Sequence, residues 1–512
     1  LRDGVRYDGE DAFGFRRFIL HHAAIAKAAG GVSRFVIGSE MIGLTTSAAA
    51  SGYPAVAQLR ALASEVRTLL PTARLTYAAD WTEYFGHHPA DGSGDVTFHL
   101  DPLWASPAID AVGIDAYFPL SDWRDGEHLD EGFADSIYDE TYLKNNIEDA
   151  EGYMFYYASD SNRANQIRTP ITDGLGKPWV FRYKDIRNWW GQPHYNRIGG
   201  FEQSSPTQWT PESKPIWFTE IGCPAVDKGA NQPNVFYDPK SAESRLPYHS
   251  NGQRDDLIQR RYLEAVLDYW DESNAVSALT GEPMVLTDWT HVWCWDARPF
   301  PEFPARTSVW SDGPNWRLGH WLSGRTGLAN LSEIVSEICI ASGLKNFDAS
   351  ALQGLVSGYG LDRPMSARGA LEPLMLAYDF SAKETESGLE FFMMDEGEIR
   401  DLDPQFCVKI SDQPFVKFLR DDVETRPKDV RLSFIDEAYD YQLGAVYARG
   451  ELSESVAVKD YALPLMLDTA AATRISEGIL NRSLAAMNTL QWTSGPDHAD
   501  WEIGDRVRLP GS

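Results

Sequence analysis

The sequence predicts an α/β protein that begins with a partial (β/α)8 barrel of the TIM type, over residues 1–315, and continues with α+β domains. Over roughly the first three hundred residues, short β-branched runs alternate with stretches of helical period, which is typical of parallel βα units. From about Gly388 the pattern changes to successive strands interrupted by one helix, which indicates an antiparallel sheet. A chain of 512 residues is long enough for roughly two to four domains.

Five strands are expected in the barrel, each a short apolar run that ends in polar residues. They are expected at residues 34–40, 74–81, 108–120, 214–222 and 290–299. A closed barrel needs eight strands, so the barrel is either cut short or completed by strands that precede residue 1. The abrupt start inside a helix favours the second explanation.

Periodic apolar positions predict the barrel helices between these strands. Phe15, Phe18, Ile19 and Ile25 recur at helical spacing, which predicts the first helix, and Gly30 and Gly31 are expected to end it. The next two helices are expected near residues 59–69 and 258–269, by the same criterion.

A long insertion, residues 121–213, separates the third and fourth expected strands and is rich in Tyr, Trp, Asn and Arg. A segment of this length in a compact domain usually has its own structure or a function. It leaves from the C-terminal end of a strand, which is the functional face of a barrel. We expect it to grip a glycan or to pack against other proteins, and aromatic and Arg residues suit both.

Two further domains are expected after the barrel. Residues 316–385 contain helical patterns that start near Leu331 and Ser366 and predict a small helical α+β domain. Residues 386–512 alternate as strands around a helix at 468–482, which predicts a β-rich domain.

Composition excludes several classes of function. The formal net charge of −29 at pH 7 argues against nucleic acid binding, which needs clustered Lys and Arg. No run of eighteen apolar residues is present, so no transmembrane segment is expected. Cysteine and histidine spacing indicates no metal site, so free buried thiols and isolated surface histidines are expected at Cys223, Cys294, Cys339, Cys407, His87, His88, His99 and His194.

The C-terminal ends of barrel strands converge on one site, so the polar and aromatic residues there are the candidates for function. A retaining glycosidase needs one carboxylic acid to protonate the leaving oxygen and one carboxylate to attack the anomeric carbon, roughly 5–5.5 Å apart. Two glutamates on strands separated by two others can meet that requirement. The candidates at the strand ends are Glu40, Asp80, Trp81, Asp115, Tyr117, Glu220, Trp293 and Trp295.

Each candidate also has a structural interpretation. Glu220 can cap the next helix or pair with an Arg, and Glu40 can organise the loop that contains Thr45 and Thr46. Asp80 and Asp115 suit a hydrogen-bonding scaffold better than chemistry. Trp293 and Trp295 can stack on a sugar or fill a core.

The strand-end motifs resemble those of the large clan of barrel glycosidases. GSE at 38–40 resembles the acid/base motif of its fourth strand, and WFTEIG at 217–222 resembles the nucleophile motif of its seventh. By this resemblance Glu40 is the acid/base, Glu220 the nucleophile, Tyr117 the group that orients it, and Trp293 or Trp295 the sugar platform. The five strands then correspond to strands four to eight. One departure is Ser39, where the clan usually has an Asn that holds the substrate 2-hydroxyl.

Longer motifs resemble a narrower family. GGVSRFVIGSEMIGLT, SKPIWFTEIGCPAVDKGANQPNVFYDPKS and VWCWDARPFPEFP are similar to the barrel-like domain of gene transfer agent and phage tail-tip proteins. ANLSEIVSEICIASGL, LQGLVSGYGLDRPMSARGALEPL and WEIGDRVRLP are similar to phage tail hub modules. The resemblance implies a baseplate hub component, usually trimeric, at the tail tip of a virion-like particle that is made in the bacterial cytoplasm.

The sequence therefore predicts a tail protein whose barrel acts on, or binds, envelope or cell-wall carbohydrate, with neighbouring tail proteins as partners and no cofactor. One alternative is an inactive barrel that serves as a spacer or a glycan-binding adaptor. A carboxyl separation beyond about 9.5 Å would favour it. A third hypothesis, an ordinary glycosidase with accessory domains, conflicts with the hub-like second half.

Overall fold

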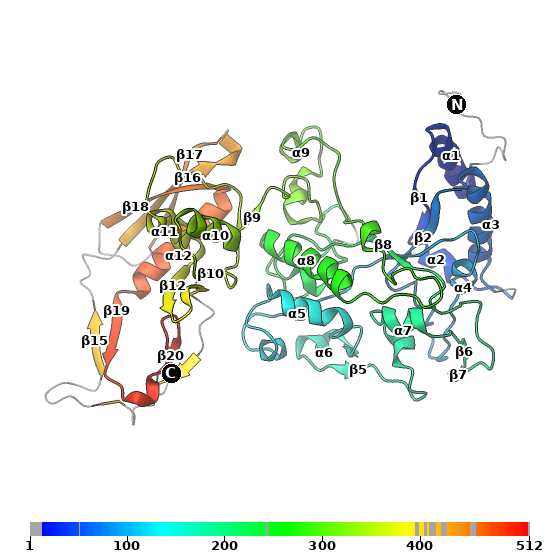
Figure 1. Cartoon of the computed structure of the whole chain (residues 1–512), viewed down its shortest axis with the longest axis horizontal. Coiled ribbons are helices and arrows are strands. Elements are labelled where there is room, and N and C mark those ends of the chain that lie inside the picture. Colours follow the sequence, from blue (N-terminus) through cyan, green and yellow to red (C-terminus); the bar gives the residue numbers. More distant parts are fainter. Residues whose placement is uncertain are drawn as a thin grey trace. The chain divides into compact units, whose positions relative to one another are not determined.

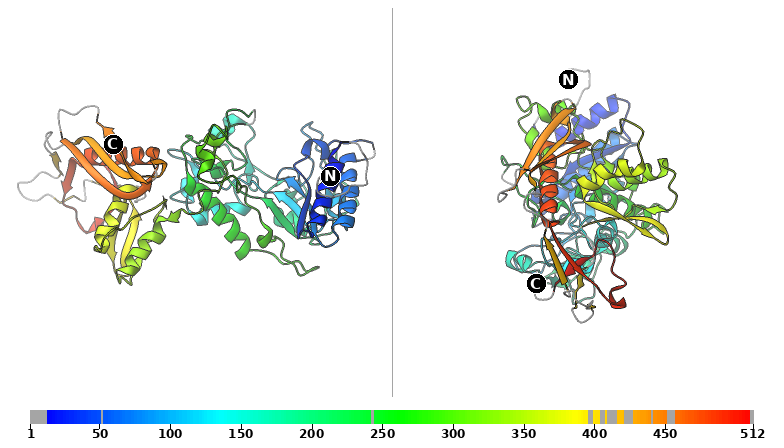
Figure 2. Two further views of the ribbon diagram at one scale, coloured as in Figure 1. Left: turned by 90° about the horizontal axis from the view of Figure 1, so that it is seen from above. Right: turned by 90° about the vertical axis from the view of Figure 1, so that its left-hand side faces the viewer.

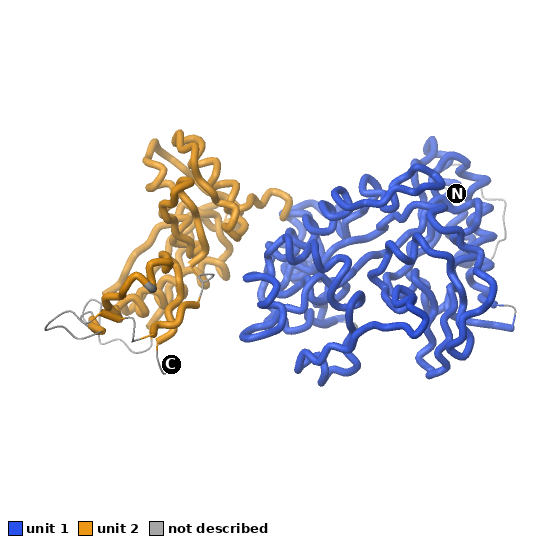
Figure 3. The backbone as a smooth tube through the Cα atoms, turned by 60° about the horizontal axis from the view of Figure 1, so that its bottom comes forward, with its two compact units in different colours: residues 1–324 blue, residues 325–512 orange. Residues whose placement is uncertain are grey.

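The computed structural model describes residues 13–50, 52–241, 244–394, 399–403, 407–408, 416–420, 427–439, 441–450 and 457–509. The chain divides into two compact units, Leu1–Gly324 and Arg325–Ser512, which Figure 3 shows in different colours. The expected division into 1–315, 316–385 and 386–512 stays a prediction. Each unit has its own cluster of buried apolar side chains.

The first unit is built on a parallel sheet of four strands in the order β1-β2-β3-β8. These strands are β1 (Arg34–Ser39), β2 (Arg74–Asp80), β3 (Val112–Asp115) and β8 (Ile216–Glu220). They coincide with four of the five expected strands, and their parallel order is that of an α/β domain. The fifth expected strand meets the sheet through one parallel bridge, Ile221↔Val292, and Val285, which precedes it, forms another with Ile216. Within the described ranges the sheet is open.

Helices precede, separate and follow the strands of this sheet along the chain, and α1 and α3 lie beside β1 and β2 (Figure 1). The longer ones are α1 (Phe15–Ala28), α3 (Pro54–Leu69) and α8 (Asp256–Glu272). The shorter ones are α2 (Ile42–Thr45), α4 (Asp101–Trp104) and α9 (Glu302–Ala305). The helix expected from the spacing of Phe15, Phe18, Ile19 and Ile25 is present as α1, although Phe15, Phe18 and Ile25 are exposed. Its buried residues are Ile19, Leu20, Ala23 and Ala26, and α1 packs against α3 and β1.

The insertion has its own secondary structure, as expected. It consists of short elements: α5 (Glu140–Asn145), β4 (Phe155–Tyr156), α6 (Asp160–Ala164), β5 (Thr169–Pro170), α7 (Ile186–Gly191), β6 (Arg197–Ile198) and β7 (Phe201–Glu202). Buried aromatic side chains, including Trp179, Trp189 and Trp190, join it to the core of the sheet. A buried lysine, Lys184, donates to the carbonyl oxygens of Pro119 and Asp149, at 2.7 and 2.8 Å. The insertion is therefore part of the first unit's core.

The second unit is α+β, as the sequence predicts. In it, β16 pairs with β17 in the antiparallel direction and with β18 in the parallel direction, and α12 packs against β16 and β17 (Figure 2). Its helices are α10 (Leu331–Ala341), α11 (Ala367–Tyr378) and α12 (Thr469–Ala485). Its strands are β9 (Ala329–Asn330), β10 (Phe347–Asp348), β11 (Leu355–Val356), β12 (Phe380–Thr385), β13 (Gly388–Met393), β14 (Ile399–Asp401), β15 (Val416–Arg420), β16 (Pro427–Asp436), β17 (Gln442–Arg449), β18 (Ala457–Leu467), β19 (Asn488–Trp492) and β20 (Arg506–Arg508).

Two other expectations from composition can be compared with the structure. All four cysteines are free, and Cys223, Cys339 and Cys407 are buried. Among the described residues, no helix is both long enough and apolar enough to cross a membrane.

Candidate functional site

Three carboxyl groups meet at the C-terminal edge of the parallel sheet. Glu40 directly follows β1, Asp115 is the last residue of β3, and Glu220 is the last residue of β8. One carboxylate oxygen of each residue lies within 4.8 Å of the corresponding oxygens of the other two. Parallel strands place their carboxyl ends at one edge, which is why residues 180 positions apart in sequence come together here.

Hydroxyl groups hold two of these carboxyls in place. The Tyr117 hydroxyl donates to Glu220 Oε2 at 2.7 Å. Asp115, which is fully buried, accepts from Thr219 Oγ1 at 2.6 Å and from Ser39 Oγ at 3.1 Å. Ser39 and Thr219 come from β1 and β8, so Asp115 connects both outer strands of the sheet through its two oxygens.

Glu40 is placed by the backbone. It has a positive φ of 50°, in the left-handed region that few non-glycine residues adopt. Its N–H donates to the carbonyl oxygen of Ala78 on β2 at 2.9 Å. Its side chain is exposed, whereas Asp115 is buried and Glu220 is half-buried. The three carboxyls therefore differ in their access to solvent.

A glycine lets the middle strands approach closely enough for this arrangement. A Cβ atom at Gly113, on β3, would lie 2.3 Å from the carbonyl oxygen of Tyr77 on β2. Any side chain at this position would push the two strands apart and move Asp115 away from Glu40.

Burial and the repulsion between neighbouring carboxylates raise the pKa values of Asp115 and Glu220. Burial and the negative charge of Glu220 raise the pKa of Asp115 to about 7. Burial and the charge of Glu40 raise the pKa of Glu220, against the opposing effect of the Tyr117 hydrogen bond. Burial and the charge of Glu220 also raise the pKa of Tyr117, which keeps its hydroxyl a donor. The cluster therefore keeps its last proton to a higher pH than carboxyls in water do, because the pKa of Asp115 is about 7.

The other expected site residues lie around this cluster. Trp293 and Trp295 are 49% and 63% exposed, and the Trp293 N–H donates to the carbonyl oxygen of Ile221, the residue after Glu220. Trp81 is half-buried, and its ring meets Tyr183 of the insertion edge-on. Asp80 accepts from the backbone N–H of Thr82 at 2.7 Å and so stabilises its own turn. Its charge still contributes to the raised pKa of Asp115.

The structure adds a residue that the sequence did not indicate. His320 is buried, its ring meets Tyr117 edge-on at 5.9 Å, and its Nε2 donates to the carbonyl oxygen of Pro233 at 2.8 Å. It supports the tyrosine that holds Glu220. It belongs to a segment with no regular pattern, so only the three-dimensional contact reveals it.

The histidines were expected at the surface, and this is wrong for two of them. His99 and His194 are buried. His194 lies between an Asp101 carboxylate at Nδ1 and the Trp189 carbonyl oxygen at Nε2, and it stacks on Phe98. It packs as a core residue because aromatic neighbours from the insertion enclose it. Among the described residues, the group with metal-ligand spacing is the carboxyl cluster, whose oxygens are of the kind that hard divalent cations take.

Comparison with protein families decides what kind of chain carries this site. The sequence model of the family described as "GTA TIM-barrel-like domain" matches residues 13–304, more than half of the chain. The chain belongs to this family. Residues 366–512 match the model described as "Putative phage tail protein". The two matches confirm that this is a gene transfer agent or phage tail protein.

Two solved structures are similar to parts of this tail protein. A chain in the virion of a native gene transfer agent particle is 31% identical, with a TM-score of 0.37, over 40% of this chain and 47% of that one. The prophage MuSo2 43 kDa tail protein from Shewanella oneidensis is 12% identical, with a TM-score of 0.25, over 36% of this chain and 58% of that one. This chain thus spans less than two thirds of either solved chain. No curated protein matches the sequence.

Proposed function

We propose that the first unit of this tail protein is a retaining glycoside hydrolase that acts on envelope or cell-wall glycan. The observation that carries the proposal is the spacing of the paired carboxyls: Glu40 and Glu220 have oxygens within 4.8 Å of each other. This bound falls below the roughly 6.5–9.5 Å of an inverting pair and lies near the roughly 5–5.5 Å of a retaining pair.

The geometry gives each residue a role. Glu220 attacks the anomeric carbon while Glu40 protonates the leaving oxygen, which forms a glycosyl ester and releases the alcohol. Glu40, now ionised, takes a proton from water, and that water attacks the anomeric carbon and frees Glu220. The hydrogen bond from Tyr117 aims one Glu220 oxygen and stabilises its charge. The exposed side chains of Trp293 and Trp295 offer sugar platforms, and the backbone N–H of Trp293 is bonded to Ile221, the residue after Glu220.

The third carboxyl explains how the nucleophile stays ionised. Glu220 has a raised pKa, which by itself works against a nucleophile. Asp115, fully buried and with a pKa of about 7, takes up the shared proton more readily than a carboxyl in water. When Asp115 is neutral, its repulsion of Glu220 disappears. Asp115 thus acts as a proton-holding neighbour of the nucleophile.

One observation favours a second function, a glycan-binding adaptor or spacer without turnover. Ser39 stands where barrel glycosidases place the donor that holds the substrate 2-hydroxyl, and its hydroxyl donates to Asp115 at 3.1 Å. The Ser39 hydroxyl, which would hold the sugar, is therefore bonded within the protein instead. The tail-tip position, the trimeric hub and the neighbouring tail proteins as partners belong to the same proposal, and the hub-like motifs of residues 316–512 support them.

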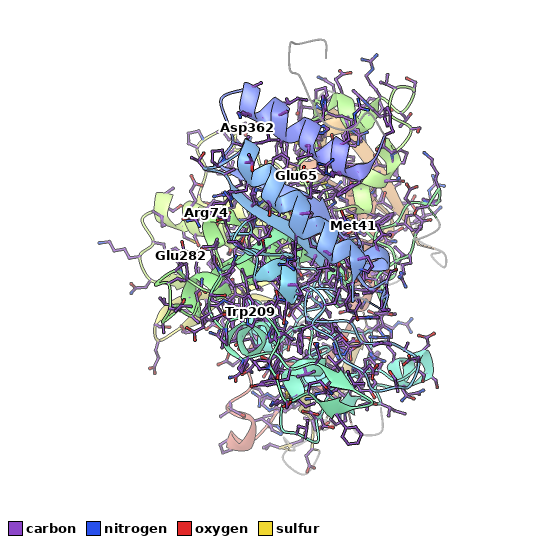
Figure 4. The ribbon with its side chains drawn as sticks, turned by 90° about the vertical axis from the view of Figure 1, so that its right-hand side faces the viewer. Met41, Glu65, Arg74, Trp209, Glu282 and Asp362 are labelled. Carbon is purple, nitrogen blue, oxygen red and sulfur yellow. The ribbon has the colours of Figure 1, made fainter. Side chains whose placement is uncertain are left out.

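Release of reducing ends from peptidoglycan and envelope glycans tests the function. We expect the full-length protein to release them and Glu220→Gln to lose at least about a thousandfold in rate. Glu282→Gln is the matched control, because Glu282 is an exposed partner of Arg74 before the start of the fifth expected strand (Figure 4). Retained anomeric configuration in the product supports the retaining mechanism. Binding without release in both proteins would support the adaptor instead.

A further inference from the structure

A further buried carboxyl group, separate from the three at the sheet edge, contacts the turn that carries Glu40. Glu83 follows β2 by three residues and is fully buried. Its oxygens accept from the Tyr77 hydroxyl at 3.0 and 3.1 Å, from the Thr45 hydroxyl, and from the Asp80 backbone N–H at 3.3 Å. It belongs to neither the acid/base pair nor its immediate neighbours.

These bonds connect Glu83 to both ends of the Glu40 turn. The Tyr77 hydroxyl, which donates to Glu83, also accepts from the Met41 backbone N–H at 2.7 Å. Thr45 ends α2, the short helix that follows Glu40. The carboxyl therefore fixes the residue directly after Glu40 through Tyr77, and the end of the same turn through Thr45.

A buried carboxyl at this position costs stability, so its bonds must compensate. Burial raises the pKa of Glu83 to about 7, against the hydrogen bonds from Thr45 and Tyr77. A neutral apolar side chain would avoid that cost. Only an acceptor with two oxygens can take the hydroxyl bonds of Tyr77 and Thr45 and the Asp80 N–H together.

We propose that Glu83 is a positioning residue: through Tyr77 and Thr45 it holds the turn that presents Glu40 to the Glu220 side of the site. The inference rests on the proposed function, because it assigns Glu40 the acid/base role. Its structural part, the hold on residues 40–46, can be tested without turnover.

Hydrogen exchange of the full-length protein tests that hold directly. Tyr77→Phe removes the single oxygen between Met41 and Glu83, and Glu83→Leu removes the carboxyl. We expect exchange in residues 40–46 to become about tenfold faster or more in both variants, while α3 and β2 keep their protection. Glu83→Gln keeps one accepting oxygen and should restore part of the protection.

Glu65→Gln is the matched control. Glu65 lies on α3 and makes a partly exposed ion pair with Arg16 on α1; Met41 and Glu65 are both labelled in Figure 4. This variant should leave exchange in residues 40–46 unchanged. Exchange in 40–46 that matches the control, or that rises equally over the whole first unit, would overturn the inference. Because Tyr77→Phe deletes one atom, it keeps the test valid even where Glu83→Leu fails to fold.

A kinetic comparison on aryl glycosides separates positioning from general damage. Acid assistance matters most for a poor leaving group, so a displaced Glu40 should slow such a substrate about tenfold more than an activated one. An equal loss on both substrates would contradict positioning. If the wild-type protein cleaves neither substrate, the proposed function fails, and the exchange result alone decides whether Glu83 holds the turn.

Discussion

Two buried carboxyl groups of the first unit, Asp122 in the insertion and Asp115 at the sheet edge, lie in opposite electrostatic surroundings. In the insertion, the Asp122 carboxylate accepts from the side chains of Arg124 at 3.2 Å, Arg168 at 3.0 Å, Tyr157 at 2.5 Å and Gln166 at 3.1 Å. At the sheet edge, Asp115 accepts only hydroxyl bonds from Ser39 and Thr219 among its described hydrogen bonds. The charges that act on Asp115 are those of other carboxylates.

The two environments shift the pKa values in opposite directions. Although burial raises it, the hydrogen bonds from Tyr157 and Arg168 hold the pKa of Asp122 below its ordinary value. Burial and the charge of Glu220 raise the pKa of Asp115 to about 7. Compensated acids stabilise a fold, whereas like charges gathered at a strand edge cost stability and are typical of functional sites. The direction of the pKa shift therefore singles out the carboxyls around Asp115, and not Asp122, as the group to test for chemistry.

The largest effect is expected from breaking the compensated cluster. Asp122→Asn leaves Arg124 and Arg168 without their shared carboxylate and should lower the free energy of unfolding by about 3 kcal/mol at pH 8. Because the pKa of Asp122 is lowered in the folded state, its contribution is present above the ordinary carboxyl pKa and is lost as the pH falls. Urea unfolding of the first unit at pH 8 and at pH 2.5, below the ordinary carboxyl pKa, measures both. An equal loss of stability at the two pH values would contradict the role of the Arg124 and Arg168 hydrogen bonds.

A smaller effect of opposite sign is expected at the site. The pKa of Asp115 rises from 3.8 to about 7 on folding, so its contribution is favourable at low pH and is lost as the pH rises toward 7. Asp115→Asn removes this cost and should stabilise the first unit by about 2 kcal/mol at pH 8, with the gain fading toward pH 4. Thermal or urea unfolding across this range checks the sign, and destabilisation at pH 8 would mean that Asp115 is a structural acid like Asp122.

The smallest stability change is expected at the proposed sugar platform. Trp295 is 63% exposed, so Trp295→Ala should change the free energy of unfolding by no more than about 0.5 kcal/mol. Loss of a stacking face should nonetheless weaken glycan binding about tenfold. Binding to insoluble peptidoglycan, measured beside the unfolding curve, distinguishes a ligand contact from core packing. Unchanged binding with lower stability would place this tryptophan in the core.

The sequence predicted the site where a simple rule applied. Parallel strands end at one edge, so the polar ends of four strands brought together Glu40, Asp115 and Glu220 without any knowledge of the loops. The rule also identified Tyr117, which donates to Glu220 at 2.7 Å. The spacing and hydrogen bonds of these residues follow from sheet geometry, while their catalytic roles stay predictions.

The sequence did not predict contacts that depend on loop conformation. Thr45 was weighed as a partner of Glu40, but its hydroxyl donates to Glu83, because the turn at Glu40 directs the short helix α2 over the buried carboxyl. The burial of His194 depends on aromatic residues of a long insertion, whose path has no periodic signal, and His99 is buried beside Tyr53 and His87. Helical spacing predicted α1 but does not show which stripe of a helix is covered, and Phe15, Phe18 and Ile25 are exposed.

At pH 6, Asp115 is expected to be largely protonated because its pKa is raised to about 7, whereas the pKa of Asp122 in the insertion is lowered and this carboxyl is ionised. An infrared difference spectrum at pH 6 distinguishes these two protonation states, because a protonated carboxylic acid has a C=O stretching band that a carboxylate lacks. Subtracting Asp115→Asn from the wild-type protein should leave such a band, and subtracting Asp122→Asn should leave none. A carboxylate signal from Asp115, or a protonated band from Asp122, would contradict the protonation states assigned to these two residues.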